Sequence, residues 1–215
     1  MTRVRRTQAE RSASTKAALT EAAIRALYEH GYAATTTMLV AEEAGVSRGA
    51  MLHQFGTKHD LMTHVVETVY EEELRQYAEL LTGLTEPAER LLAMCDAVWT
   101  VLSRPSGVAV LEIMQGSRSD PVLAERLAPV QARIEEDALA SVSRSTGLDR
   151  ATALSLMRLM VWSARGLSIA KVLAPDQDHV ADAMGLLRRL IENAVATRTL
   201  ALRKRGERTA ASATE

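Results

Sequence analysis

The sequence has little of what anchors many other classes of protein. Cys95 is the one cysteine among 215 residues, which excludes an intrachain disulfide and a cysteine-rich metal site. We expect Cys95 to be a small buried residue. The most apolar stretch, residues 154–174, is interrupted by three basic side chains, and the basic first fifteen residues lack the apolar centre of a signal peptide. These absences predict a soluble protein of the cytoplasm with no membrane segment.

Motifs for catalysis and metal binding are also lacking. The chain has no Walker loop, dinucleotide fingerprint, nucleophile elbow or HExxH. His59 and His64 are five positions apart, which on a helix separates them by about 140° and prevents a shared metal site. We expect both histidines, and the acidic run Glu71 to Glu73, to lie on solvated surfaces. The sequence therefore predicts no enzyme, no cofactor and no metal.

What is abundant favours helices. Apolar residues make up 47% of the chain and aromatic residues only 3%, while Ala, Leu, Arg and Glu are common. Glycines at helix ends, capping residues such as Thr36, Ser47 and Asp120, and the prolines Pro87 and Pro121 divide the chain into helical segments. The prediction is an all-α fold with helices at about 16–31, 36–44, 47–55, 57–81, 86–104, 107–116, 120–145, 149–173 and 177–204.

Charge is unevenly distributed along the chain. Residues 1–58 contain eight Lys and Arg against five Asp and Glu, although the whole chain has 26 against 27. A basic first quarter joined to an acidic body suggests that any binding of a polyanion belongs to the N-terminal segment.

Residues 36–55 have the layout of a helix-turn-helix. Ala41 is small enough to let two helices approach, and Gly45 makes the turn between them. Val46, Met51 and Phe55 are expected to fill the angle between the helices. Arg48 and Gly49 disobey local rules, since a cation opposes the helix dipole in a first turn and a glycine weakens a helix interior. Both choices suit a DNA surface, where arginine can bind guanine and glycine admits a phosphate.

Residues 12–66 resemble the DNA-binding domain of the tetracycline-repressor (TetR) family. The resemblance is carried by Ala22-Ala23, Leu27-Tyr28, Gly31-Tyr32, Thr36, Val40-Ala41, Ala44-Gly45-Val46-Ser47, Gly49, Phe55, Lys58 and Leu61. It implies a three-helix DNA-binding domain at 11–56 and a helical ligand-binding and dimerisation domain at 57–206, joined through the fourth helix. The ends are interpreted from their composition: residues 1–10 are a basic tail without periodicity and residues 207–215 have no apolar face, so we expect both to be disordered.

The resemblance also implies a double-stranded DNA operator with palindromic symmetry. Backbone contacts are expected from Thr36, Thr37 and Lys58, and base contacts chiefly from Arg48 and His53. The family usually has tyrosine where this chain has Leu52, and histidine or tyrosine at Gln54; a thymine methyl is a possible partner for Leu52. The DNA-binding set is Thr36, Thr37, Ser47, Arg48, Gly49, Ala50, Leu52, His53, Gln54 and Lys58. Arg3, Arg5 and Arg6 either reach the minor groove or flanking phosphates, or form a disordered tail.

For the body, the resemblance implies a homodimer and a small-molecule effector. The helices near 149–173 and 177–204 are expected to pack against their mates, with Leu154, Met157, Val161, Leu186, Leu190 and Val195 as members of the interface. The residues expected to line a ligand pocket are Met94, Trp99, Met114, Gln115, Met160, Trp162 and Arg165. They favour a largely apolar ligand with an anionic group meeting Arg165.

Two alternatives stay open at this point. One is a DNA-binding regulator without a small-molecule pocket. The other is an all-helical carrier or enzyme that has lost DNA recognition, which would need a site assembled from scattered residues.

Overall fold

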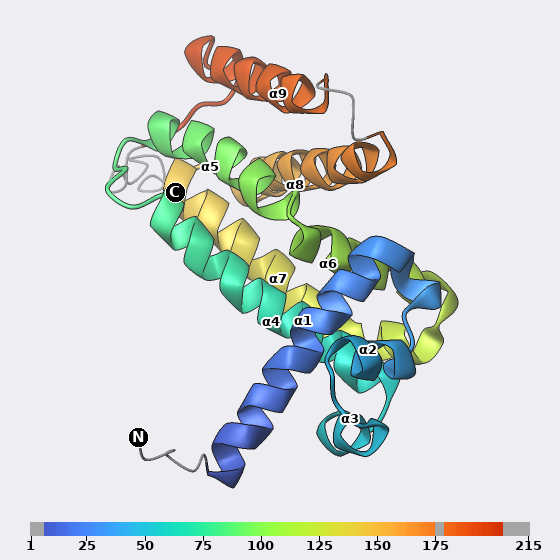
Figure 1. Ribbon diagram of the computed structural model, residues 1–215. Helices are drawn as coiled ribbons and strands as arrows, with labels where there is room; N and C mark the ends of the chain where they lie inside the picture. Colours follow the sequence, from blue (N-terminus) through green and yellow to red (C-terminus); the bar gives the residue numbers. More distant parts are fainter. Residues whose placement is uncertain (1–6, 175–178, 204–215) are drawn as a thin grey trace, which may run out of the picture. The chain divides into compact units, whose positions relative to one another are not determined.

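The computed structural model describes residues 7–174 and 179–203, without the side chains of His179 and Ala181, and every regular element in this part is helical (Figure 1). The all-α prediction is confirmed. None of the described helices is long and apolar enough to cross a membrane. The elements are α1 (Gln8–Ala34), α2 (Thr37–Glu43), α3 (Arg48–Gln54), α4 (Lys58–Leu80), α5 (Pro87–Leu102), α6 (Pro105–Gly116), a 3-10 turn (Ser117–Ser119), α7 (Pro121–Thr146), α8 (Arg150–Leu173) and α9 (His179–Ala196).

The two terminal helices differ from the predicted ranges. The first helix begins at Gln8, because Thr7 and Glu10 form a capping box in which each side chain accepts a hydrogen bond from the other's backbone N–H. Residues 8–10 are therefore helical, although the predicted tail included them. Helix α9 ends at Ala196, earlier than the predicted 204. The tail arginines Arg3, Arg5 and Arg6, the start predicted at 177 and the tail at 207–215 lie outside the described residues.

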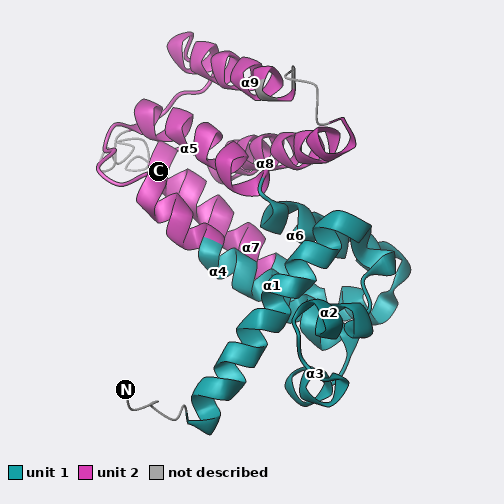
Figure 2. Ribbon diagram, viewed as in Figure 1, with its two compact units in different colours: residues 1–72, 104–131 teal, residues 73–103, 132–215 magenta. Residues whose placement is uncertain are grey.

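The chain forms two compact units (Figure 2). Unit 1 contains the described residues up to 72 together with 104–131, and unit 2 contains 73–103 and the described residues from 132 onward. Helices α4 and α7 each contribute to both units. This differs from the predicted division at 56/57, because α6 and the first part of α7 belong with the helix-turn-helix. Amphipathic spacing reports which face of a helix is buried and says nothing of the helix that covers it.

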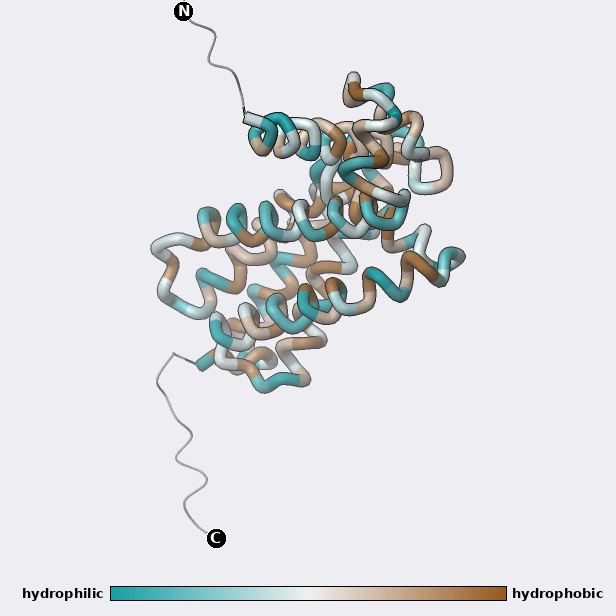
Figure 3. Tube along the Cα trace, turned by 90° about the horizontal axis from the view of Figure 1, so that it is seen from below, coloured by the Kyte–Doolittle hydropathy of each residue, from teal (hydrophilic) through white to brown (hydrophobic). Residues whose placement is uncertain are grey.

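Unit 1 is held by apolar residues from all of its helices. Polar and apolar positions alternate along these helices, as expected for amphipathic segments (Figure 3). Helix α1 packs chiefly on α6 and also contacts α2 and α3. The most deeply buried side chains of unit 1 include Leu19, Leu27, Val40, Met51, Leu61, Ile113, Leu123 and Leu127.

The end of α1 packs against α6. Gly31 has φ +75°, which turns the chain so that the backbone N–H of Tyr32 donates to Glu112 Oε2 at 3.2 Å. The Tyr32 ring lies so close to Gly116 that a Cβ there would stand 2.3 Å from Tyr32 Cδ1. A side chain at position 116 would therefore displace the tyrosine.

Asp120 connects the end of α1 to α4 and α7. Its Oδ1 accepts a hydrogen bond from the backbone N–H of Leu123 at 3.1 Å, which caps α7 as predicted. Its Oδ2 accepts the Tyr32 hydroxyl at 3.0 Å and pairs with His59 Nε2 at 2.9 Å. The Leu123 bond first, and then those of His59 and Tyr32, lower the pKa of Asp120 to about 2. His59 is thus ion-paired and half-buried, and the expectation of a solvated histidine was wrong.

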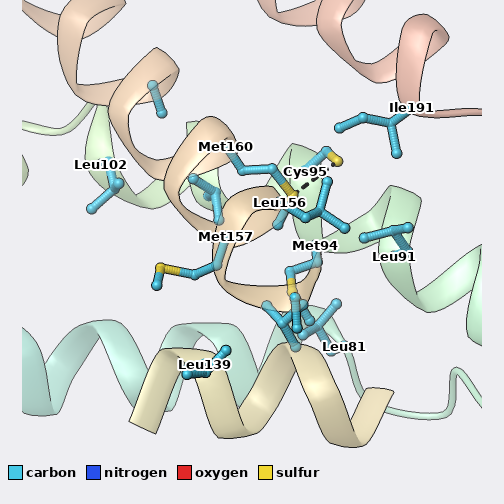
Figure 4. Packing of buried hydrophobic residues seen from close by; sticks show 14 of the residues in the cluster. Leu81, Leu91, Met94, Cys95, Leu102, Leu139, Leu156, Met157, Met160 and Ile191 are labelled. Carbon is cyan, nitrogen blue, oxygen red and sulfur yellow. Dashed lines mark hydrogen bonds between the residues drawn. The ribbon is translucent and has the colours of Figure 1, made fainter. Parts of the chain in front are cut away.

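Unit 2 is built on contacts among α5, α8 and α9, with α7 and the end of α4 completing the core (Figure 4). Four methionines belong to this apolar cluster: Met94, Met157, Met160 and Met184. The Cys95 thiol lies among them, 3.4 Å from Met160 Sδ, and burial raises its pKa to about 12. The prediction of a small buried residue at this position is confirmed.

The Asp120 contacts predict an acid-dependent stability of unit 1. Since the pKa of this carboxyl is lower in the folded protein than its ordinary value of about 4, its contribution is complete above about pH 4 and is lost as the pH falls through about 2. We expect Asp120→Asn to lower the melting temperature at pH 7 and to flatten the decline between pH 4 and 2, measured by circular dichroism. The control is Asp182→Asn, which replaces an exposed carboxylate on α9. Identical acid profiles for Asp120→Asn and the wild type would contradict the assignment.

Candidate functional site

Helices α2 and α3 form two short arms joined by a tight turn. Thr36 caps α2 by accepting a hydrogen bond from the N–H of Leu39, and Ser47 caps α3 by accepting one from Ala50, both at 3.1 Å. Gly45 between them has φ +64°, a left-handed conformation that favours glycine. Both predicted caps and the predicted turn are present.

The angle between these helices is filled as the sequence predicts. Val40, Ala41, Met51 and Phe55 are each at most 4% exposed, and Val46 is half-buried. A seven-residue helix is too short to be stable in isolation. Helix α3 therefore depends on these buried contacts, which also set its direction.

Most of the predicted DNA-binding residues form the outer surface of this motif. Arg48, Gly49, Leu52 and His53 are exposed along α3, and Ala50 is half-buried. The capping residues Thr36 and Ser47 are exposed too, beside the half-buried Thr37. A capping hydroxyl uses an oxygen lone pair, so its proton stays available for a phosphate. This surface therefore combines one cation with several hydrogen-bond donors.

Gln54 and Lys58 are instead bound to the chain itself. Gln54 Nε2 donates to Ser12 Oγ at 2.8 Å, which ties the end of α3 to α1. Lys58 Nζ donates to the carbonyl of Tyr32 at 2.7 Å and lies 3.9 Å from the centroid of that ring. Burial lowers the pKa of Lys58. Each side chain uses one donor in these contacts and keeps further N–H groups. Within the protein, the two contacts tie the end of α3 and the start of α4 to α1.

Gly49 has open space around it. A Cβ at this position would meet only Ser47 Oγ, at 3.9 Å, which is an ordinary contact. No contact among the described residues therefore requires glycine here.

A polar recess of about 360 Å³ opens in unit 1 beside α3. Thr63, whose buried hydroxyl has no hydrogen-bond partner, contributes to its wall together with Lys16, Gln54, Phe55, Asp60, His64, Glu67 and Arg126. Burial and then the charge of Lys16 lower the pKa of His64, which is half-buried and not solvated as expected. None of the predicted pocket residues lines this recess. Within the described part of the chain, no three His, Cys, Asp or Glu side chains are grouped to hold a metal ion.

The predicted pocket residues are divided between the units. Met94, Met160 and Arg165 are buried in unit 2, where Trp99 is half-buried and Trp162 is 53% exposed. Met114 and Gln115 belong to α6 in unit 1, half-buried and exposed respectively. The expected set therefore does not belong to one unit, and its buried members all lie in unit 2.

Glu73 is a residue whose importance the sequence reasoning missed. It is 8% exposed, whereas the acidic run 71–73 was expected to be solvated. Burial raises its pKa to about 7, against the opposing charge of Arg165, and its Oε1 has no hydrogen-bond partner. The signal was the spacing, since Glu73 continues the buried positions Met62, Val66 and Val69 along α4.

Comparisons with known proteins agree with this architecture. Residues 19–65 match the family model described as bacterial regulatory proteins, tetR family. The HTH-type transcriptional regulator CymR of Pseudomonas putida is 32% identical over 178 residues, which cover 81% of this chain and 88% of that protein. The chain belongs to the TetR family. Since its relatives are transcriptional regulators, this TetR-family protein is a DNA-binding regulator and not an enzyme.

Two further relatives of this TetR-family protein are informative. The HTH-type transcriptional repressor AcnR of Corynebacterium glutamicum is 30% identical over 133 residues, which cover 58% of this chain and 62% of that protein. The crystal structure of the multidrug binding protein EbrR complexed with imidazole superposes with a TM-score of 0.59 at 25% identity, covering 81% of this chain and 93% of that one.

Replacement of Gly49 should change the stability of the protein and its affinity for DNA in opposite directions. Because a Cβ fits inside the free protein, Gly49→Ala should raise the free energy of unfolding by about 0.5–1 kcal/mol. If the glycine admits the DNA backbone, the same methyl should lower DNA affinity about tenfold, or about 1.4 kcal/mol. Chemical denaturation and fluorescence anisotropy measure the two effects. Thr100→Ala, which improves an exposed site on α5, should leave DNA affinity unchanged, and a Gly49→Ala protein with full affinity would contradict the prediction.

Proposed function

We propose that this TetR-family regulator is a homodimeric repressor of the cytoplasm that reads a palindromic operator with α3 and leaves it on binding a small, largely apolar effector. The observation that carries the DNA-binding part is the outer face of α3, which is exposed while Met51 and Phe55 on its other side are buried. Repression is supported by the similarity to AcnR, a transcriptional repressor, and an effector by the similarity to EbrR, a multidrug binding protein.

Direct reading of bases is assigned to Arg48 and His53. Both are exposed on α3, and a guanidinium can donate two hydrogen bonds to the acceptors of guanine. Leu52, 46% exposed, offers an apolar contact for a thymine methyl. Thr36, Thr37 and the other donors around α3 are assigned to phosphates, which position the helix without reading sequence.

Dimerisation is supported by an unpartnered apolar face in unit 2. Leu159, Trp162 and Leu173 are each more than half exposed and lie on one side of α8, spaced three and fourteen residues from the first. Leu186 and Leu190 are likewise exposed on α9, one turn apart. One helix-turn-helix buries too little for specific binding, so a twofold pair spaced about 34–36 Å is required.

The contributors to this face differ from those expected. Met157 is 6% exposed and belongs to the core of its own unit, while Leu154, Val161 and Val195 are partly buried against that core. The interface proposed on α8 therefore uses Leu159, Trp162 and Leu173 in their place. This arrangement makes Trp162 an interface residue more readily than a pocket residue.

Replacement of Arg48 tests base reading. Arg48→Ala should weaken operator binding by about 1–3 kcal/mol at one base step, because two hydrogen bonds to that base are lost. Affinity for unrelated DNA should change much less, so the specificity ratio falls. Operator variants selected from randomised DNA, titrated by anisotropy at fixed salt, measure both quantities. Arg25→Ala on the exposed side of α1 is the matched control, and an unchanged sequence preference for Arg48→Ala removes that residue from the reading set.

A charge on the apolar face of α9 tests the dimer. Leu190→Glu should weaken the dimer at least tenfold, because a carboxylate would be buried in an apolar interface. Sedimentation velocity at micromolar concentration should then show a monomer, with operator binding lost in parallel. Leu80→Glu, at an exposed leucine of α4, should remain dimeric. A wild-type protein that is monomeric at that concentration would refute the homodimer.

A further inference from the structure

In the described part of unit 2, one pair of oppositely charged side chains is buried. Glu73 of α4 and Arg165 of α8 are both 8% exposed, and each is the main charge acting on the other's pKa. Tyr77, one turn beyond Glu73 on α4, also acts on Arg165. Buried charges are costly unless they are paired and hydrogen-bonded, so such a pair within an apolar core needs a reason.

The hydrogen bonding of this pair is incomplete. Glu73 Oε1 is buried and accepts no hydrogen bond. A buried carboxylate oxygen is a strong acceptor, and native proteins satisfy nearly all such atoms. Glu73 Oε1 can therefore accept a hydrogen bond from a further donor, such as a hydroxyl or an amine.

The charges of the pair decide which donor fits. Above its pKa of about 7, the carboxylate of Glu73 balances the guanidinium of Arg165, so at that pH the pair is neutral before any ligand arrives. A carboxylate ligand would leave one net negative charge in a buried region, and an ammonium ligand one net positive charge. A hydroxyl adds a donor without adding charge.

Helix α8 carries Arg165 together with part of the methionine-rich cluster. Its buried residues include Met157, Met160, Arg165 and Ser168, and both methionines belong to the apolar cluster of unit 2. Methionine side chains adjust their shape to fill irregular space, which suits a site that opens around an apolar guest. The Arg165 guanidinium also lies 5.9 Å from the centroid of the Trp162 ring, so this tryptophan can report on changes at the pair.

We propose that Glu73 and Arg165 are the polar anchor of the effector site, and that the effector is an uncharged, largely apolar alcohol or phenol whose hydroxyl donates to Glu73 Oε1. This inference rests on the proposed function for its regulatory meaning. It replaces the anionic group expected opposite Arg165, because the charge of that residue is already balanced within the protein.

Three probes of one shape test the chemistry on the wild-type protein. We would titrate 2-naphthol, naphthalene and 2-naphthoate at about pH 8, above the pKa of Glu73, and follow tryptophan fluorescence and thermal stabilisation. The expected order places 2-naphthol at least tenfold tighter than both analogues. Equal binding of 2-naphthol and naphthalene, binding of none, or tightest binding of 2-naphthoate would overturn the proposal.

Glu73→Gln tests the anchor itself. The substitution keeps the shape but leaves the charge of Arg165 unbalanced, so the preference should invert toward 2-naphthoate. Glu79→Gln, at an exposed carboxylate on the same helix, should keep the wild-type order. An unchanged order in a folded Glu73→Gln protein overturns the proposal, and if that variant does not fold, the wild-type series still decides.

Release of DNA is measured separately by mobility shift, so that the two proposals can fail independently. If 2-naphthol binds with the expected order but the operator stays bound, the anchor stands and the proposed release fails. If 2-naphthol releases DNA equally from the wild type and from Glu73→Gln, release stands and the anchor is overturned.

Discussion

The seating of Tyr32 against Gly116 is the contact on which the rest of unit 1 depends. Helices α2 and α3 have seven residues each, too few to persist without tertiary support. Support comes from α1, and the end of α1 is in turn held by Glu112 and Asp120 of the α6–α7 segment. The unit that presents α3 therefore includes residues more than sixty positions beyond the motif. Helices α4 and α7 each have residues in this unit and in the other.

The two units use buried polarity for different ends. In unit 1, each oxygen of Asp120 has partners, and the result is a fixed joint. In unit 2, the carboxylate of Glu73 is left with an unfilled acceptor inside a mainly apolar core. Apolar residues of similar volume would often stabilise a core as well or better. A polar pair retained there under that cost is more readily understood as a means of recognition than as a source of stability.

Local chemistry was predictable from the sequence, and long-range pairing was not. Ser47 caps α3 by accepting a hydrogen bond from Ala50, three residues away, so the neighbouring sequence is enough to predict its role. The pairing of His59 with Asp120 joins residues 61 positions apart, and no local pattern reports it. Glu73 lies between these cases: the helical spacing indicated a buried position, but its charge and the acidic run favoured the surface. The partner that made burial tolerable, Arg165, lies on another helix.

The burial of Cys95 has a practical consequence. Its pKa of about 12 leaves almost no thiolate at neutral pH, and only the thiolate reacts with alkylating reagents. Because this is the one cysteine in the chain, the native protein is close to a cysteine-free background without any substitution. A single cysteine engineered on an exposed helix face can then carry a spin label or a fluorophore, and the distance between identical positions in two subunits becomes directly measurable.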